Sequence, residues 1–295
     1  MGIAVATAIA VRTKRIHVGT AVNVLPLNHP LRIAEESATV DHLSEGRFEL
    51  GIGRSGAART YDVLGIPYGE SQARFREALE IIKEAWKGQP FSYEGKFYRF
   101  QNATVVPRPY QKPHPPIRMA ANTPDTFPLV AQLGLPIFVG LRDVNIPELQ
   151  ESLRSYRRAW TEAGHTAKPS VYLRIPVYAA ATEKDALEEP VESITFYFSR
   201  QADLQQGAVG RTGAGPAERL QARVERLAGL SYEQILAERV AFGSAAGLID
   251  RLTQLREELS LDGIVAELDA GGLIPAERVK RSLSILTQQV MPAFK

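Results

Sequence analysis

The chain has 295 residues, of which 44% are hydrophobic and 23% charged, and its formal net charge is +2. This ordinary composition favours a globular protein with a sizeable core, and it gives no reason to expect nucleic acid or a membrane as a partner. The absence of cysteine excludes disulfide scaffolds, thiolate catalysis and cysteine-ligated metals, and it fits a cytoplasmic protein. The apolar run Met1–Ala10 precedes its charges, unlike a signal peptide.

Taken in chain order, the sequence opens on a predicted helix and then alternates short apolar strands with helices. The predicted strands are Ile16–Asn23, Phe48–Gly53, Ile117–Ala121, Ile137–Gly140, Val171–Ala181 and Gly263–Leu268. The predicted helices that follow are Leu31–Ser44, Gln72–Lys87, Asp125–Leu133, Pro147–Ala163, Ala245–Leu259 and Ala276–Val290. This alternation predicts an α/β fold with a parallel sheet in a single domain, residues 1–295. On the pattern alone, a closed barrel and an open doubly wound sheet are both compatible with it.

Two stretches interrupt the alternation. The run Phe91–Phe100 alternates around Gly95, which predicts a β-hairpin. The stretch Glu183–Ser231 has no clear pattern and a glycine-rich middle. A connection of this length is typically a lid or a disordered loop, so we expect a variable, lid-like insertion around residues 183–240, with Gly207–Gly215 as the closing segment.

Ligands of parallel α/β folds bind at the carboxyl ends of the strands, which selects a few candidates. Thr123 precedes Pro124 at a predicted helix start, and Thr126 follows. A helix N-terminus with added hydroxyls can bind phosphate, but a plain N-cap at Thr123 explains the same residues. Arg54 follows a Gly-x-Gly at the end of a strand, where it could pair with a phosphate or be an ordinary surface arginine.

The 5 histidines lie on different predicted elements without the spacing of metal ligands, so no metal site is expected. His29 precedes Pro30 after a strand and could face a pocket, which makes it a weak candidate for catalysis. A turn or cap role accounts for it equally.

Four blocks of sequence resemble the luciferase-like flavin monooxygenases. They are Leu25–Arg32 (LPLNHPLR), Asp41–Phe48 (DHLSEGRF), Ala120–Thr126 (AANTPDT) and Val290–Phe294 (VMPAF). The resemblance covers nearly the whole chain and is weakest over Glu183–Val240. It implies a (β/α) TIM barrel of eight strands that binds reduced FMN, receives it from a separate flavin reductase, and uses molecular oxygen to oxygenate a small organic substrate. Some relatives use the deazaflavin F420 instead.

The resemblance also assigns cofactor-binding residues. It places the flavin ring near Ala21 and Val22, whose peptide bond matches a non-proline cis bond in luciferase. Arg54, Thr123 and Thr126 match the family's phosphate contacts. Asn122 stands where luciferase has an acidic residue beside the flavin, so its role departs from the family pattern.

The resemblance further implies two strands and a helix ahead of the helix that here begins near Met1, so the chain is expected to carry about six of the eight barrel strands. A fragment or late start and a true short variant are the two explanations. The function is then an FMN-dependent monooxygenase, a non-catalytic flavin-binding short barrel, or an F420-dependent dehydrogenase. A homodimer through the helices over Met1–Thr13 and Leu31–Ser44 is the family's usual assembly.

Overall fold

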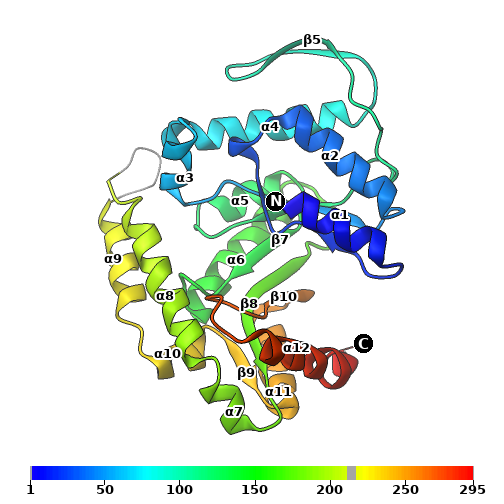
Figure 1. Ribbon diagram of the computed structural model, residues 1–295. Helices are drawn as coiled ribbons and strands as arrows, with labels where there is room; N and C mark the ends of the chain where they lie inside the picture. The colour runs from blue at the N-terminus through cyan, green and yellow to red at the C-terminus, as the bar shows by residue number, and fades with distance from the viewer. Residues whose placement is uncertain (1, 211–216, 295) are drawn as a thin grey trace. The chain divides into compact units, whose positions relative to one another are not determined.

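The structure, a computed structural model, describes residues 2–210 and 217–294. The chain forms two compact units, one comprising Met1–Ala120 with Gly207–Ala217 and the other Ala121–Gln206 with Glu218–Lys295. Each unit combines parallel strands with helices (Figure 1), which confirms the predicted α/β class.

In the first unit, a short parallel sheet is centred on β3, which pairs with β1, β2 and β6. The strands of this sheet are β1 (Val18–Gly19), β2 (Asn23–Val24), β3 (Phe48–Gly53) and β6 (Ile117–Ala120). The predicted strand Ile16–Asn23 is therefore two short pieces interrupted at residues 20–22. The predicted hairpin is confirmed as β4 (Phe91–Glu94) and β5 (Arg99–Ala103), and it extends away from α4 in Figure 1.

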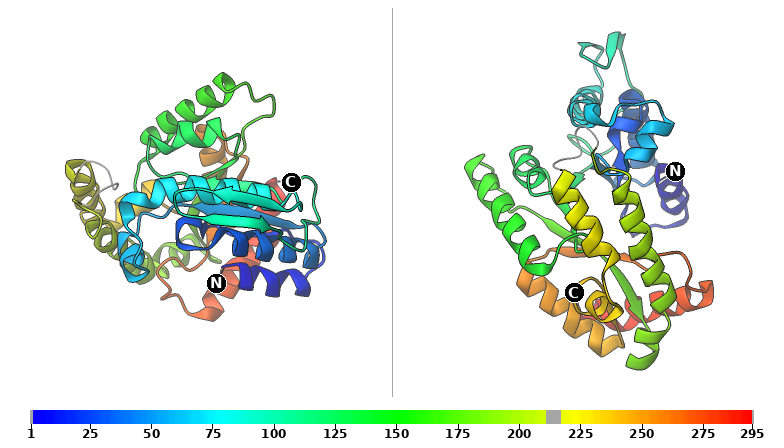
Figure 2. Two further views of the ribbon diagram at one scale, coloured as in Figure 1. Left: turned by 90° about the horizontal axis from the view of Figure 1, so that it is seen from above. Right: turned by 90° about the vertical axis from the view of Figure 1, so that its left-hand side faces the viewer.

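Helices cover the β3 sheet on the face that carries Phe48, Leu50 and Ile52, all three fully buried. The helical segments of this unit are α1 (Gly2–Arg12), η1 (Leu25–Leu27), α2 (Pro30–Leu43), α3 (Ala58–Val63), η2 (Tyr68–Glu70) and α4 (Ser71–Ala85). Helix α2 packs against β3 and has α1 and α4 as neighbours, as Figures 1 and 2 show.

In the second unit, β8 is the central strand and pairs in parallel with β7, β9 and β10. These strands are β7 (Ile137–Gly140), β8 (Val171–Ala179), β9 (Ala241–Gly243) and β10 (Gly263–Glu267). Along β8 the residues Val171, Leu173 and Ile175 are fully buried, whereas Tyr172 and Arg174 between them are only half-buried. This alternation separates a core face of the sheet from a more open, polar face.

Helices make up most of the rest of the second unit. They are α5 (Thr126–Gln132), α6 (Ile146–Glu162), α7 (Glu183–Glu188), α8 (Val191–Gln206), α9 (Ala217–Ala228), α10 (Tyr232–Glu238), α11 (Ala245–Leu259) and α12 (Ala276–Ile285), with η3 (Leu286–Val290) and η4 (Met291–Phe294) at the end. Ser244 caps α11 by accepting from the Gly247 N–H, as its position predicts. No helix within the described ranges is both long and apolar enough to cross a membrane.

The expectation of a long loop over Glu183–Ser231 is wrong, because this stretch contains α7, α8 and α9. Helices α8 and α9 lie side by side (Figures 1 and 2), and Gln206 donates to Gln221 between them. Of the expected closing segment Gly207–Gly215, residues 207–210 form a turn and residues 211–215 lie outside the described residues.

Candidate functional site

Arg54 leaves the carboxyl end of β3 in the first unit and is held on several sides. Its Nη1 donates to the Ser71 hydroxyl at 3.0 Å, and its guanidinium carbon lies 5.7 Å from the centre of the Tyr68 ring. The Tyr61 hydroxyl donates to the Arg54 carbonyl. Burial, with a contribution from Tyr68, raises the pKa of Tyr61, so this phenol stays protonated and remains a donor. The guanidinium is thus positioned by the fold and is more than a mobile surface group.

Ala21 and Val22 lie beside the same strand end, and the peptide bond between them is cis. The neighbouring Thr20 hydroxyl fixes this segment to β3, since it donates to the Gly51 carbonyl at 2.8 Å and accepts from the Gly51 N–H at 3.1 Å. A β-carbon at Gly53 would lie only 2.7 Å from Cγ2 of Val22, so glycine is needed there. Thr20 and Gly53 were not among the predicted site residues, although both flank them in the sequence.

Asn122, Thr123 and Thr126 belong to the second unit, in a turn that leads into α5. The Thr123 and Thr126 hydroxyls are 2.8 Å apart and hydrogen-bonded, and the Thr126 N–H donates to the Thr123 carbonyl at 2.9 Å. The predicted N-cap at Thr123 is wrong. Helix α5 begins at Thr126, and Asp125 stands at the cap position without a side-chain cap bond, because the chain makes a full turn after Pro124 before the helix begins.

Arg223, on α9, reaches this turn, and the sequence prediction missed it. Its Nη2 donates to the Asn122 carbonyl at 2.9 Å and lies 3.7 Å from a carboxylate oxygen of Asp143. Leu220, Val224 and Leu227 have helical spacing around it, which is the signal that could have located α9. The cation of Arg223 therefore lies next to the predicted cofactor turn of this unit.

Asp143 is the buried centre of a charged cluster just beyond the end of β7. It pairs with Arg142 at 3.2 Å and accepts a hydrogen bond from Gln205 on α8. Burial by itself would raise the pKa of Asp143, but Arg142, Arg223 and the hydrogen bonds outweigh burial and leave the pKa below its ordinary value. Asp143 is therefore an ionised anchor that joins α8 and α9 to the strand end.

His29, the weak catalytic candidate, is exposed and stands at the start of α2 without making a side-chain cap bond. Its ring contacts Tyr98 and Phe100 of the β4–β5 hairpin, each edge-on at 5.7 Å. The structure thus places His29 against the hairpin and offers it no acid–base partner among these contacts.

The Asp41–Phe48 block of the resemblance is largely structural. The Asp41 carboxylate accepts from the backbone N–H of Gln111 at 2.8 Å and from its side chain at 2.7 Å. Arg47 donates to the carbonyls of Ala10 and Ile16 and so closes the end of α1. These residues hold the segments around β3 in place, and the candidate binding residues lie instead at the strand ends.

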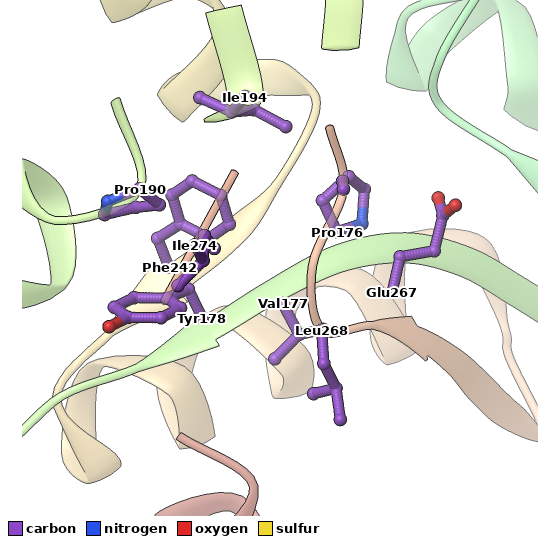
Figure 3. A pocket seen from close by; sticks show the side chains of 10 residues that line it. Pro176, Val177, Tyr178, Pro190, Ile194, Phe242, Glu267, Leu268 and Ile274 are labelled. Carbon is purple, nitrogen blue, oxygen red and sulfur yellow. The ribbon is translucent and has the colours of Figure 1, made fainter. Parts of the chain in front are cut away.

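A small pocket of the second unit lies at the carboxyl ends of β8, β9 and β10 (Figure 3). Its walls are mostly apolar and include Tyr178, Phe242 and Ile194. Glu267 is the acidic residue among its lining residues.

Comparison with known proteins finds relatives of similar sequence and solved structures of similar fold. The oxygenase component of a flavin-dependent trigonelline monooxygenase from Acinetobacter baylyi is 28% identical over 296 residues, which cover 97% of this chain and 78% of that protein. The FMN complex of the oxygenating constituent of 3,6-diketocamphane monooxygenase from Pseudomonas putida has a TM-score of 0.79 at 22% identity, covering 99% of this chain and 84% of that chain. The coenzyme F420-dependent tetrahydromethanopterin reductase from Methanopyrus kandleri has a TM-score of 0.77 at 21% identity, covering 100% and 88%.

Parallel strands flanked by helices, polar groups at the strand ends and these likenesses define an α/β protein of the luciferase-like TIM-barrel class. The family model of luciferase-like monooxygenases matches residues 2–262. The chain belongs to that family, as its sequence blocks predicted.

Proposed function

We propose that this chain binds reduced FMN and uses it with molecular oxygen to oxygenate a small organic substrate. The observation that carries the proposal is the fixed guanidinium of Arg54 at the end of β3, held by Ser71 and stacked near Tyr68. Arginine presents its N–H donors in a rigid fork that matches a phosphate group, and Ser71 takes one of the five. A phosphate monoester such as that of FMN fits this group.

Except for Asn122, the other predicted cofactor-binding residues are assigned to the flavin ring or the phosphate. Ala21 and Val22 would support the flavin ring, since Thr20 and Gly53 fix them beside β3. In the second unit, the family resemblance assigns Thr123 and Thr126 to the cofactor's phosphate, and their hydrogen-bonded hydroxyls are groups that can donate to an anion. Asn122 departs from the family pattern and has no defined role in this proposal. When bound, the reduced flavin would supply the electrons that activate oxygen. The protein's part is to bind, orient and shield it.

The named relatives support the proposed partners and suggest an alternative. The trigonelline enzyme is named as the oxygenase component of its system, which favours a separate flavin reductase as the source of reduced FMN. The exposed side chains Val5 and Ile9, one helical turn apart, give α1 an apolar surface, which favours a homodimer through that helix. The F420-dependent reductase supports F420 as the alternative cofactor, and a flavin-binding protein without turnover is the other alternative.

The test is to mix the purified chain with chemically reduced FMN, then with oxygen, and follow flavin absorbance and oxygen use by stopped flow. We expect slower reoxidation of reduced FMN than in buffer, and oxygen incorporation from ¹⁸O₂ into a product when candidate small organic substrates are screened. Retention of F420 in preference to FMN would shift the assignment to a dehydrogenase. Tight binding of oxidised FMN, with reoxidation as fast as in buffer and no labelled product, would contradict a monooxygenase.

A further inference from the structure

Two arginines of the second unit, Arg142 and Arg174, lie near the carboxyl ends of its strands. Arg174 on β8 pairs in register with Gly140 of β7 and Val265 of β10. Because side chains alternate along a strand, Glu267 of β10, two residues beyond Val265, is expected on the same face as Arg174. The ion pair between Arg174 and Glu267 agrees with this placement. Arg142 lies beyond the end of β7, and Tyr197 interacts with both arginines.

Both arginine side chains are partly accessible. The side chain of Arg174 is 41% exposed and that of Arg142 is 27% exposed, although each already has a carboxylate partner. The absence of a side chain at Gly140 leaves space beside Arg174 on the strand that leads to Arg142. A ligand could therefore reach both cations from the open side.

The cluster carries more positive than negative charge. In this cluster of five described residues, three guanidiniums (Arg142, Arg174 and Arg223) form ion pairs with two carboxylates (Asp143 and Glu267). Partly buried charge without a counter-charge is unfavourable, and an anionic ligand would balance it.

A phenol completes this surface. Tyr197 on α8 interacts with Arg142, Arg174 and Glu267. Burial and the charge of Glu267 raise the pKa of Tyr197, so its hydroxyl stays protonated and can donate to an anion. Guanidinium and hydroxyl groups both donate hydrogen bonds to a carboxylate.

The apolar pocket in Figure 3 adjoins this donor set, because Glu267 belongs to both. The Tyr178 and Phe242 rings meet edge-on with centres 6.2 Å apart and form part of its wall. This pocket has a volume of about 10 Å³, room for about one water molecule, so the body of an organic ligand stays outside it. Resting on the proposed function, we infer that the substrate of this chain is a small organic acid, whose carboxylate binds at Arg142, Arg174 and Tyr197.

The test compares benzoate with benzamide, which has a similar shape and no charge. Binding of each to the full chain is measured by ligand-observed NMR titration, with and without FMN. We expect benzoate to bind at least about 10-fold more tightly than benzamide, since a charge-assisted hydrogen bond has roughly this effect. The variant Arg174→Gln should remove most of the preference, and Arg174→Lys should restore part of it.

Two further variants control for folding and for general charge. The double variant Arg174→Gln, Glu267→Gln leaves no unpaired carboxylate, and it should fold and still lack the preference. Arg154→Gln on α6 removes an exposed guanidinium that pairs with Glu151, and it should bind benzoate like the wild type.

Equal binding of benzoate and benzamide, or binding of neither, would overturn the inference. So would an Arg174→Gln variant that loses FMN affinity and keeps its benzoate preference, because the arginine would then serve the cofactor. Failure of FMN to bind would contradict the proposed function, whereas the benzoate preference measured without FMN would be unaffected by that failure.

Discussion

The Thr20 hydroxyl makes two hydrogen bonds to the backbone of Gly51, one to its carbonyl at 2.8 Å and one from its N–H at 3.1 Å. Thr20 is buried, so no water readily replaces either bond. Through this side chain, the segment with Ala21 and Val22 is fixed to β3, the strand that also delivers Arg54.

Thr20→Val should therefore destabilise the protein. The substitution keeps the shape and removes both buried hydrogen bonds between the Thr20 side chain and the Gly51 backbone, which together cost about 1–3 kcal/mol. Urea unfolding measures the loss. Thr39→Val removes an exposed hydroxyl on α2 and should change the unfolding free energy by no more than about 0.5 kcal/mol. Equal effects of the two substitutions would show that the Thr20–Gly51 bonds are unimportant.

Gly53→Ala should both destabilise the chain and weaken flavin binding. Its β-carbon would lie 2.7 Å from Cγ2 of Val22, so Val22 must move, at a cost of about 1–3 kcal/mol. Gly56→Ala is the matched control, because a β-carbon there has no atom within 4 Å. Thermal unfolding and flavin titration of both variants check the prediction, and wild-type behaviour of Gly53→Ala would refute it.

Asp143→Asn should reduce stability in a pH-dependent way. Burial opposes ionisation of Asp143, but Arg142, Arg223 and the bond from Gln205 leave its folded-state pKa below the ordinary value. Its stabilising contribution is therefore complete above pH of about 4 and is lost as the pH falls through the lower folded-state pKa. We expect the variant to be about 3 kcal/mol less stable at neutral pH, as when one partner of a buried pair is removed.

The difference between this variant and the wild type should narrow on acidification below pH of about 4. Urea unfolding across a pH series measures it. Asp203→Asn, on the exposed side of α8, is the control and should show little change at any pH. A difference for Asp143→Asn that is constant or grows toward low pH would mean that Asp143 is not an ionised anchor.

Elements with a strong local signal could be predicted from the sequence. Helix α11 was predicted with its observed bounds, Ala245–Leu259, because Ser244 caps it and its apolar residues repeat with helical spacing. Strands β3 and β7 were also predicted with their observed bounds, since each is a short, mostly apolar run between turns. Strand β9 was missed, because three residues ending in a glycine carry too little pattern.

The insertion was misread for a physical reason. The composition of residues 183–240 is dominated by a glycine-rich middle. The helical spacing of apolar residues in the flanking helices α8 and α9 was therefore overlooked. The Ser231 capping box with Gln234, which begins α10, was a further missed signal.

The candidate site could be predicted only as single residues. Arg54 was correctly placed after β3, but Ser71, which orients it, lies 17 positions further on at the start of another helix. Arg223 meets Asn122 across 101 positions, a contact that tertiary packing alone creates. Local sequence patterns identify candidate residues at strand ends. They do not show which side chains, distant in the sequence, contact and orient those residues.

The most direct test of the central claim is the effect of Arg54→Ala on the binding of FMN and riboflavin, which differ by the phosphate. Quenching of flavin fluorescence gives both dissociation constants, with Arg59→Ala on the exposed side of α3 as the control. We predict that Arg54→Ala weakens FMN binding about 10-fold or more while riboflavin binding changes little, because only FMN loses a charge-assisted contact. Equal losses for the two flavins, or no loss for FMN, would contradict the assignment of Arg54 to the flavin phosphate.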